Sequence, residues 1–154
     1  MKEKAFISLG VQARWLSRRL EWHLLGNHLI VNAKALVYAG LYFKNGEADY
    51  WLERGVSILN KQITEQILLD GGHFELSPMY HALVLEDIMD LVNIAETYGR
   101  SEISREWKTL IPKMISWLNF MSHPDGRISF FNDSAFGIAC ENSELKSYAY
   151  RLGI

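Results

Sequence analysis

The stretch that decides the fold is residues 70–98, DGGHFELSPMYHALVLEDIMDLVNIAETY, in which a glycine-rich segment leads into a long apolar helix. The first nine residues hold two adjacent glycines and a proline, so they do not form regular structure. From residue 79 onward, apolar side chains occupy nearly every helix face, with Glu86, Asp87 and Asp90 as the main exceptions. Such a helix packs on more than one side. The stretch therefore predicts a central helix that follows a long loop.

Helical spacing of apolar residues continues through the rest of the chain. We expect helices at residues 11–25, 28–43, 48–69, 79–98, 102–121 and 143–152, joined as antiparallel hairpins. Pro112 predicts a kink or break at Ile111, and residues 128–133 are the only strand-like segment. No linker or repeat divides the sequence. It predicts one all-α domain over residues 1–154, a bundle or a section of an α/α barrel.

Composition excludes several classes of function. The 154 residues include 16 Lys and Arg against 18 Asp and Glu, a net charge of -2, so nucleic acid is not the expected partner. Cys140 is the single cysteine, and the histidines lack metal-site spacing, so we expect no metal and no other cofactor. No apolar run is long enough for a membrane span or a signal peptide. We expect a cytoplasmic protein.

Polar side chains concentrate at the start of two predicted helices. Asn27 and His28 begin one helix, and Tyr80 and His81 lie in the first turn of another. Each has a purely structural explanation, because Asn is a common N-cap and histidines on apolar helices are often hydrogen-bonded core residues. Tyr80 alone would be an ordinary amphipathic helix residue.

Five further polar residues lie in loops. His73 and Glu75 belong to the glycine-rich loop and either position a substrate or hold the loop down. Asn132 and Asp133 are expected to cap or brace the last helix. Arg127 is expected to be an exposed turn residue, with contact to a sugar carboxylate as the alternative.

Three segments resemble the N-terminal toroid domain of the heparinase II/III-like polysaccharide lyases. They are LLGNHLIVNAKALVYAGLYF (24–43), EQILLDGGHFELSPMYHALVLEDIMDL (65–91) and HPDGRISFFNDSAFG (123–137). The resemblance runs from about residue 15 to residue 152. It implies a partial (α/α) toroid domain that lacks the first toroid helices and the C-terminal β-sandwich. It also leaves a periplasmic location open.

The resemblance further implies cleavage of an acidic, uronic-acid-containing polysaccharide by β-elimination. Asn27 and His28 match the family residues that neutralise the uronate carboxylate, and Tyr80 matches the proton donor to the leaving oxygen. The other three, His73, Glu75 and His81, are expected at the substrate-binding site.

The resemblance also implies that this chain alone is a weak or inactive lyase, because the remaining proton-transfer residue, a His or Tyr, comes from the part that is missing. One alternative is a non-catalytic carbohydrate-binding or scaffold remnant of the fold. Another is an α/α-barrel hydrolase of unsaturated uronic acids that uses Glu75 and Asp87. Toroid helices without their neighbours expose apolar faces, so self-association or a complementing chain is expected.

Overall fold

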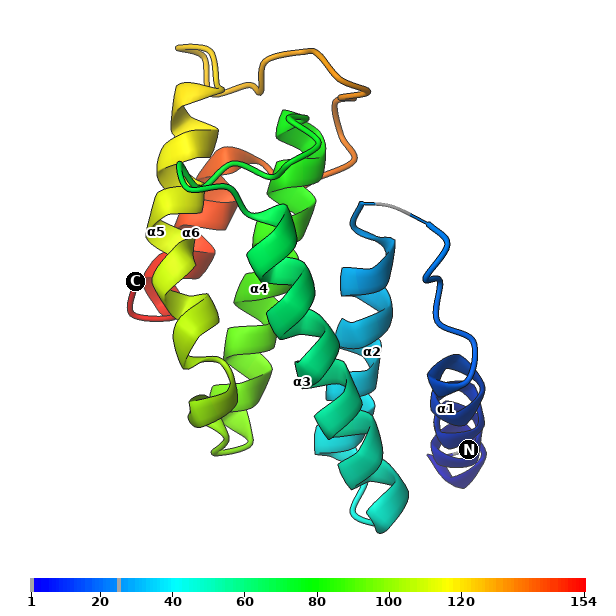
Figure 1. Cartoon of the computed structure of the whole chain (residues 1–154). Helices are drawn as coiled ribbons and strands as arrows, with labels where there is room; N and C mark the ends of the chain where they lie inside the picture. Colours follow the sequence, from blue (N-terminus) through cyan, green and yellow to red (C-terminus); the bar gives the residue numbers. More distant parts are fainter. Residues whose placement is uncertain (1, 25) are drawn as a thin grey trace. The chain divides into compact units, whose positions relative to one another are not determined.

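The computed structural model describes residues 2–24 and 26–154, and its regular structure is helical throughout these residues (Figure 1). The helices are α1 (Lys2–Ser17), α2 (His28–Tyr42), α3 (Gly46–Gln66), α4 (Pro78–Thr97), the short 3-10 helix η1 (Ser101–Ile103), α5 (Arg105–Phe120) and α6 (Asn142–Arg151). The predicted all-α class is confirmed. The bounds of α2, α3, α4 and α6 lie within three residues of those expected from sequence. None of the helices in the described residues is long and apolar enough to cross a membrane.

The chain groups into two compact units, residues 1–62 and 63–154, which are described separately below. The first unit contains α1, α2 and most of α3. Helices α2 and α3 approach closely at Gly40, where an added Cβ would lie 2.6 Å from the Leu52 nitrogen. Helix α1 contacts this pair through Phe6, whose ring centroid is 4.6 Å from that of Phe43. Elsewhere α1 exposes apolar side chains, among them Ile7, Val11 and Trp15.

The first helix differs from the sequence prediction. It was expected at residues 11–25, but α1 covers Lys2–Ser17. The chain leaves the helix because the Glu21 N–H donates to the Asn32 side chain on α2, over 3.0 Å, instead of to a helical carbonyl. Leu20 is buried just before this contact. A contact with another helix therefore overrides the apolar periodicity of residues 18–25.

The second unit departs from two further expectations. Helix α5 has no break at Pro112, because this residue lies on the exposed face, where water can satisfy the carbonyl that the missing N–H leaves unpaired; the alternative of a kink stays a prediction. The strand expected at residues 128–133 does not form in the described chain. An isolated antiparallel bridge joins Ser122 and Ile128 instead, with no neighbouring strand to extend it.

Helix α4 is the core of the second unit. Its buried side chains include Val84, Leu85, Ile88 and Leu91, all with zero exposure, and it packs against α5 and α6. The predicted central position of this helix within its unit is confirmed.

The loop before α4 lies directly on α5 at two glycines. A Cβ at Gly71 would be 2.6 Å from the backbone carbon of Lys113, and a Cβ at Gly72 would be 2.5 Å from Trp117 Nε1. Gly71 also has a φ of +92°, in the region that favours glycine. The Gly-Gly pair is therefore required for the loop to approach α5.

Replacing Gly72 with alanine tests this contact. The new methyl overlaps the Trp117 indole, so we expect Gly72→Ala to destabilise the fold by about 1–3 kcal/mol, the usual cost of overpacking. Gly46→Ala is the control, because a Cβ there has no neighbour within 4 Å. Urea unfolding followed by circular dichroism measures both. Equal midpoints for the two variants would contradict the close-approach argument.

Candidate functional site

Tyr80 is held at the first turn of α4 by a regular helix start. Ser77 is the N-cap residue, with φ -101° and ψ 118°, and its Oγ accepts a 3.4 Å hydrogen bond from the Tyr80 N–H. Pro78 follows in the first helical position, where its missing N–H costs nothing. The Tyr80 side chain is half-buried. The side chain is therefore partly exposed to solvent, on a backbone that a hydrogen bond holds in place.

His81, the next residue, points into the protein. Its Nδ1 accepts a 3.2 Å hydrogen bond from the His73 N–H, and its Nε2–H donates to the Met114 carbonyl over 2.9 Å. The ring is fully buried and lies 4.5 Å from the Trp117 ring, centroid to centroid. Burial lowers the pKa of His81 to about 4, against a smaller opposing effect of the Met114 hydrogen bond. This neutral imidazole joins the loop, α4 and α5.

His73 is also buried and neutral, but one of its nitrogens has no partner. Its Nε2–H donates to Gln66 Oε1 over 2.9 Å. Burial and the neighbouring His81 lower its pKa to about 4. Its Nδ1 is then an acceptor without a hydrogen bond, 3.9 Å from Glu75 Oε2, which is beyond hydrogen-bond distance. The structure thus brings His73, His81 and Glu75 together beside Tyr80, and their role toward substrate stays a prediction.

Asn27 and His28 belong to the first unit, at the start of α2. Asn27 occupies the N-cap position with φ -71° and ψ -12°, but its side chain makes no capping hydrogen bond. The side chain of His28 is 52% exposed, with Nδ1 3.6 Å from Glu21 Oε2. Glu21 also accepts a hydrogen bond from Asn32 Nδ2. The structural explanations considered for these two residues, a capping side chain and a core histidine, therefore do not apply.

Sequence reasoning missed the partners that hold the α4 start. Ser134 Oγ lies 3.1 Å from Ser77 Oγ and accepts a 3.3 Å hydrogen bond from the Met79 N–H. Asn132 Nδ2 donates to the Leu76 carbonyl over 3.1 Å. The Ser-Pro pair was a usable N-cap signal, but no local pattern links it to a serine 57 positions later.

The expected role of Asn132 at the last helix was wrong. Asn132 bonds to the loop before α4, whereas α6 begins at the N-cap residue Glu141. The Glu141 and Glu144 side chains form a capping box at that end. A dedicated capping pair three residues apart leaves the asparagine available for a distant partner.

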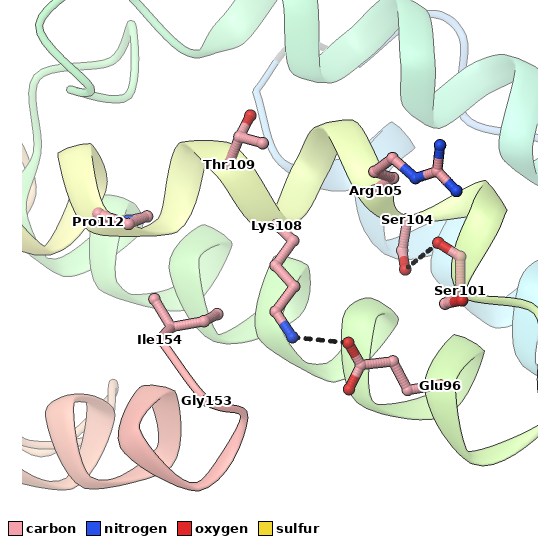
Figure 2. Close-up of a pocket in the computed structure, with 9 residues that line it drawn as sticks. All are labelled: Glu96, Ser101, Ser104, Arg105, Lys108, Thr109, Pro112, Gly153 and Ile154. Atoms are coloured by element: carbon pink, nitrogen blue, oxygen red, sulfur yellow. Dashed lines mark hydrogen bonds and ion pairs between the residues drawn. The ribbon is translucent and has the colours of Figure 1, made fainter.

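A pocket of about 500 Å³ lies elsewhere in the second unit. Figure 2 shows that residues of α4, η1, α5 and the C-terminal turn line it, with Lys108 directed toward Glu96. Lys108 Nζ donates to Glu96 Oε1 over 2.7 Å and to the Leu152 carbonyl over 2.8 Å. The predicted site residues do not line this pocket, and its lysine charge is already paired. Within the described residues, no group of three or more His, Cys, Asp or Glu side chains is placed to hold a metal ion.

The two buried histidines make the stability of the fold depend on pH. Each binds a proton below about 6.5 when unfolded but only near 4 when folded, so the unfolded state takes up more protons between these values. Stability should therefore fall as the pH drops from about 6.5 to about 4, by up to ~1.4 kcal/mol per pH unit for each histidine. His81→Gln, whose amide can donate and accept, should lower this slope by about half in urea titrations. The control His123→Gln, at an exposed position, should leave it unchanged. An unaltered slope in His81→Gln would contradict the assignment.

Comparison with known proteins finds similarity between this chain and one part of longer proteins that are named as lyases. The family model for the heparinase II/III N-terminus matches residues 5–150. A heparin-sulfate lyase of Bacteroides stercoris is 37% identical over 125 residues, which cover 80% of this chain and 18% of that protein. A heparin-sulfate lyase of Pedobacter heparinus is 31% identical over 111 residues, covering 71% of this chain and 17% of the relative. The chain thus spans less than a fifth of the length of the curated relatives it matches.

Solved structures agree with this assignment. A crystal structure of heparinase III superposes with a TM-score of 0.79 at 26% identity, over 96% of this chain and 23% of that one. The heparan sulfate lyase HepC of Pedobacter heparinus gives a TM-score of 0.65 at 28% identity, over 79% of this chain and 19% of that one. Sequence and fold therefore agree along nearly the whole chain, which belongs to the heparinase II/III N-terminal family.

Proposed function

We propose that this chain carries the carboxylate-neutralising and proton-donating residues of a lyase that cleaves uronic-acid-containing polysaccharide by β-elimination. The similar proteins named heparin-sulfate lyases make a sulfated uronate polymer the first substrate to test. The observation that carries the proposal is Tyr80, a half-buried phenol on a helix start that is fixed by hydrogen bonds.

The reaction sets the chemistry that these residues must supply. Removal of the C5 proton next to the uronate carboxylate builds negative charge on a group that is already anionic. The electrons form a C4–C5 double bond, the C4–O4 bond breaks, and O4 leaves on the departing sugar, where it takes up a proton. A well-placed hydrogen-bond donor at the developing charge contributes roughly 3–4 kcal/mol. The carboxylate therefore needs preorganised donors.

Asn27 and His28 suit the neutralising task. The Asn27 amide is not engaged in capping its own helix, and His28 projects a half-exposed imidazole from the first residue of α2. Both lie at a helix N-terminus, where the helix dipole favours a bound anion. A neutral amide and an imidazole can each donate to a carboxylate oxygen.

Tyr80 suits protonation of the departing O4. A phenol O–H is a stronger acid than the O–H of the alcohol that leaves, so it can donate its proton to O4, and it is regenerated by taking up a proton. We assign the buried His73 and His81 to holding the loop and the helix start beneath it. The second proton-transfer residue is expected outside this chain, so the chain alone should be weakly active or inactive.

The test is an exchange of segments. This chain replaces the matching segment of the Bacteroides stercoris lyase, and the ultraviolet absorbance of the unsaturated uronate product is followed on heparan sulfate. Tyr80→Phe should lower kcat on the order of 100- to 10,000-fold with little change in KM, as expected for loss of a general acid. Tyr98→Phe, an exposed tyrosine at the end of the same helix, should keep the activity of the parent chimaera.

The outcomes separate the alternatives. Full activity in Tyr80→Phe would refute the assigned acid. Binding of heparan sulfate without turnover by the parent chimaera would favour a non-catalytic role. Loss of absorbance on unsaturated oligosaccharides would favour the uronyl hydrolase.

A further inference from the structure

A second feature beside the α4 start is an exposed aromatic loop. Four large apolar side chains of the loop at residues 127–138 face solvent, with exposures between 42% and 62%: Phe130, Phe131, Phe136 and Ile138. Apolar side chains concentrated in so short a segment indicate a binding surface. We propose that Phe130, Phe136 and Arg127 form a saccharide platform, which binds an anionic sugar unit adjacent to the one at Tyr80. This inference rests on the proposed function in identifying the ligand as an acidic polysaccharide.

The loop is fastened to the helix start that carries Tyr80. Ser134 Oγ contacts Ser77 Oγ and accepts from the Met79 N–H, and the Ala135 N–H donates to Met79 Sδ over 3.4 Å. Ser77 Oγ in turn accepts from the Tyr80 N–H. The aromatic loop and Tyr80 are therefore joined through two serine hydroxyls. In Figure 1 the connection after α5, drawn in orange, passes beside the N-terminal end of α4.

Backbone strain is concentrated at the same junction. The non-glycine residues with positive φ in the described chain are Leu76, Asn132 and Asp133, at 53°, 50° and 60°. Asn132 donates to the Leu76 carbonyl, so the strained segments are in direct contact. Such conformations persist where surrounding contacts enforce them, often at binding sites. The contacts at this junction therefore hold the loop in one conformation.

The three platform residues combine an apolar face with a positive charge. The Phe130 and Phe136 rings lie 5.1 Å apart, centroid to centroid, at an interplanar angle of 36°. The Arg127 guanidinium lies over the Phe136 ring, 5.9 Å from its centroid. Arg127 also has Asp125 at 3.9 Å, but both side chains are more than 60% exposed, so this pair is weak and leaves the guanidinium available.

This combination fits an anionic sugar. The C–H groups of a pyranose carry partial positive charge and pack on the negative face of an aromatic ring. A carboxylate or sulfate on the same sugar can accept two parallel hydrogen bonds from a guanidinium. A neutral sugar would use only the rings, and an inorganic anion would use only the arginine. The platform therefore selects a ligand that has both features.

The test measures binding, separately from turnover. The full chain is titrated calorimetrically with a heparan sulfate hexasaccharide, with neutral chitohexaose and with inorganic sulfate. Phe136→Ala should weaken binding of both oligosaccharides by roughly tenfold. Arg127→Ala should weaken binding of the heparan sulfate probe by a similar factor, remove its salt dependence and leave chitohexaose unaffected. Phe136→Trp should retain affinity.

Matched controls come from the same unit. Tyr150→Ala removes an exposed aromatic ring from α6, and Arg105→Ala removes an exposed arginine from α5, so neither should change the affinity. Thermal melting confirms that each variant is folded. Because affinity is measured without turnover, a failure of the assigned acid Tyr80 leaves this result intact.

Any of several results would overturn the platform. They include wild-type affinity in both Phe136→Ala and Arg127→Ala, equal losses of affinity in the two control variants, and no binding of either oligosaccharide by the parent chain. Tight binding of inorganic sulfate that does not depend on the rings would also refute it, since the ligand would then be a small anion.

Discussion

The second compact unit depends on the two hydrogen bonds of the buried His81 ring. One nitrogen accepts from the His73 backbone in the glycine-rich loop, and the other donates to the Met114 backbone in α5. A side chain on α4 therefore satisfies backbone groups of two neighbouring segments at once. The imidazole can do both only while it is neutral, because a protonated ring has no acceptor. Burial lowers the pKa of the ring to about 4, so the ring stays neutral well below physiological pH.

A second set of contacts secures the other side of the same helix start. Ser134 contacts Ser77, and Asn132 bonds to Leu76, so the loop after α5 supports the residues that precede α4. Tyr80 thus lies on a backbone supported from both sides. This arrangement accounts for left-handed non-glycine residues at the junction, because many contacts fix a conformation that a free loop would abandon. Rigid support of this kind is what a proton donor needs to meet a leaving oxygen at one position.

Much of this unit could be predicted from sequence, and the exceptions have physical causes. The long apolar helix α4 and the glycine-rich loop before it were evident, because helical periodicity and glycine placement are local signals. The end of α1 could not be predicted, since the Asn32 side chain on α2 accepts a hydrogen bond from the Glu21 N–H. The possible helix break at Pro112 does not occur, because an exposed proline need not break a helix whose buried face is well packed.

The residues of the candidate site divide in the same way, into those that a short sequence pattern identifies and those whose partners are distant in the sequence. The Tyr-His pair at residues 80–81 and the Asn-His pair at residues 27–28 could be picked out because each is a short pattern at a helix start. Gln66 and Ser134 could not be identified from sequence. An amide or a hydroxyl acquires its role only from a partner that the fold brings near, here His73 and Ser77. The same holds for the aromatic platform. Phe130 lies in the strand-like segment at residues 128–133 and Phe136 lies beyond it, so only the folded loop brings the two rings together.

The positions of the individual charged and polar groups matter more for binding than the net charge of the chain. A net charge of -2 gives no general attraction for an acidic polymer, and the buried His73 and His81 add no positive charge near neutral pH. The anion recognition that we propose depends on individual groups: the Asn27 amide and the His28 imidazole at the α2 start, and the Arg127 guanidinium above a phenylalanine ring. Fixed dipoles and single charges stabilise charge that develops at one atom better than a diffuse field does, because they need no reorganisation during the reaction. Net charge governs how fast a polymer approaches, whereas placement governs which bond is cleaved.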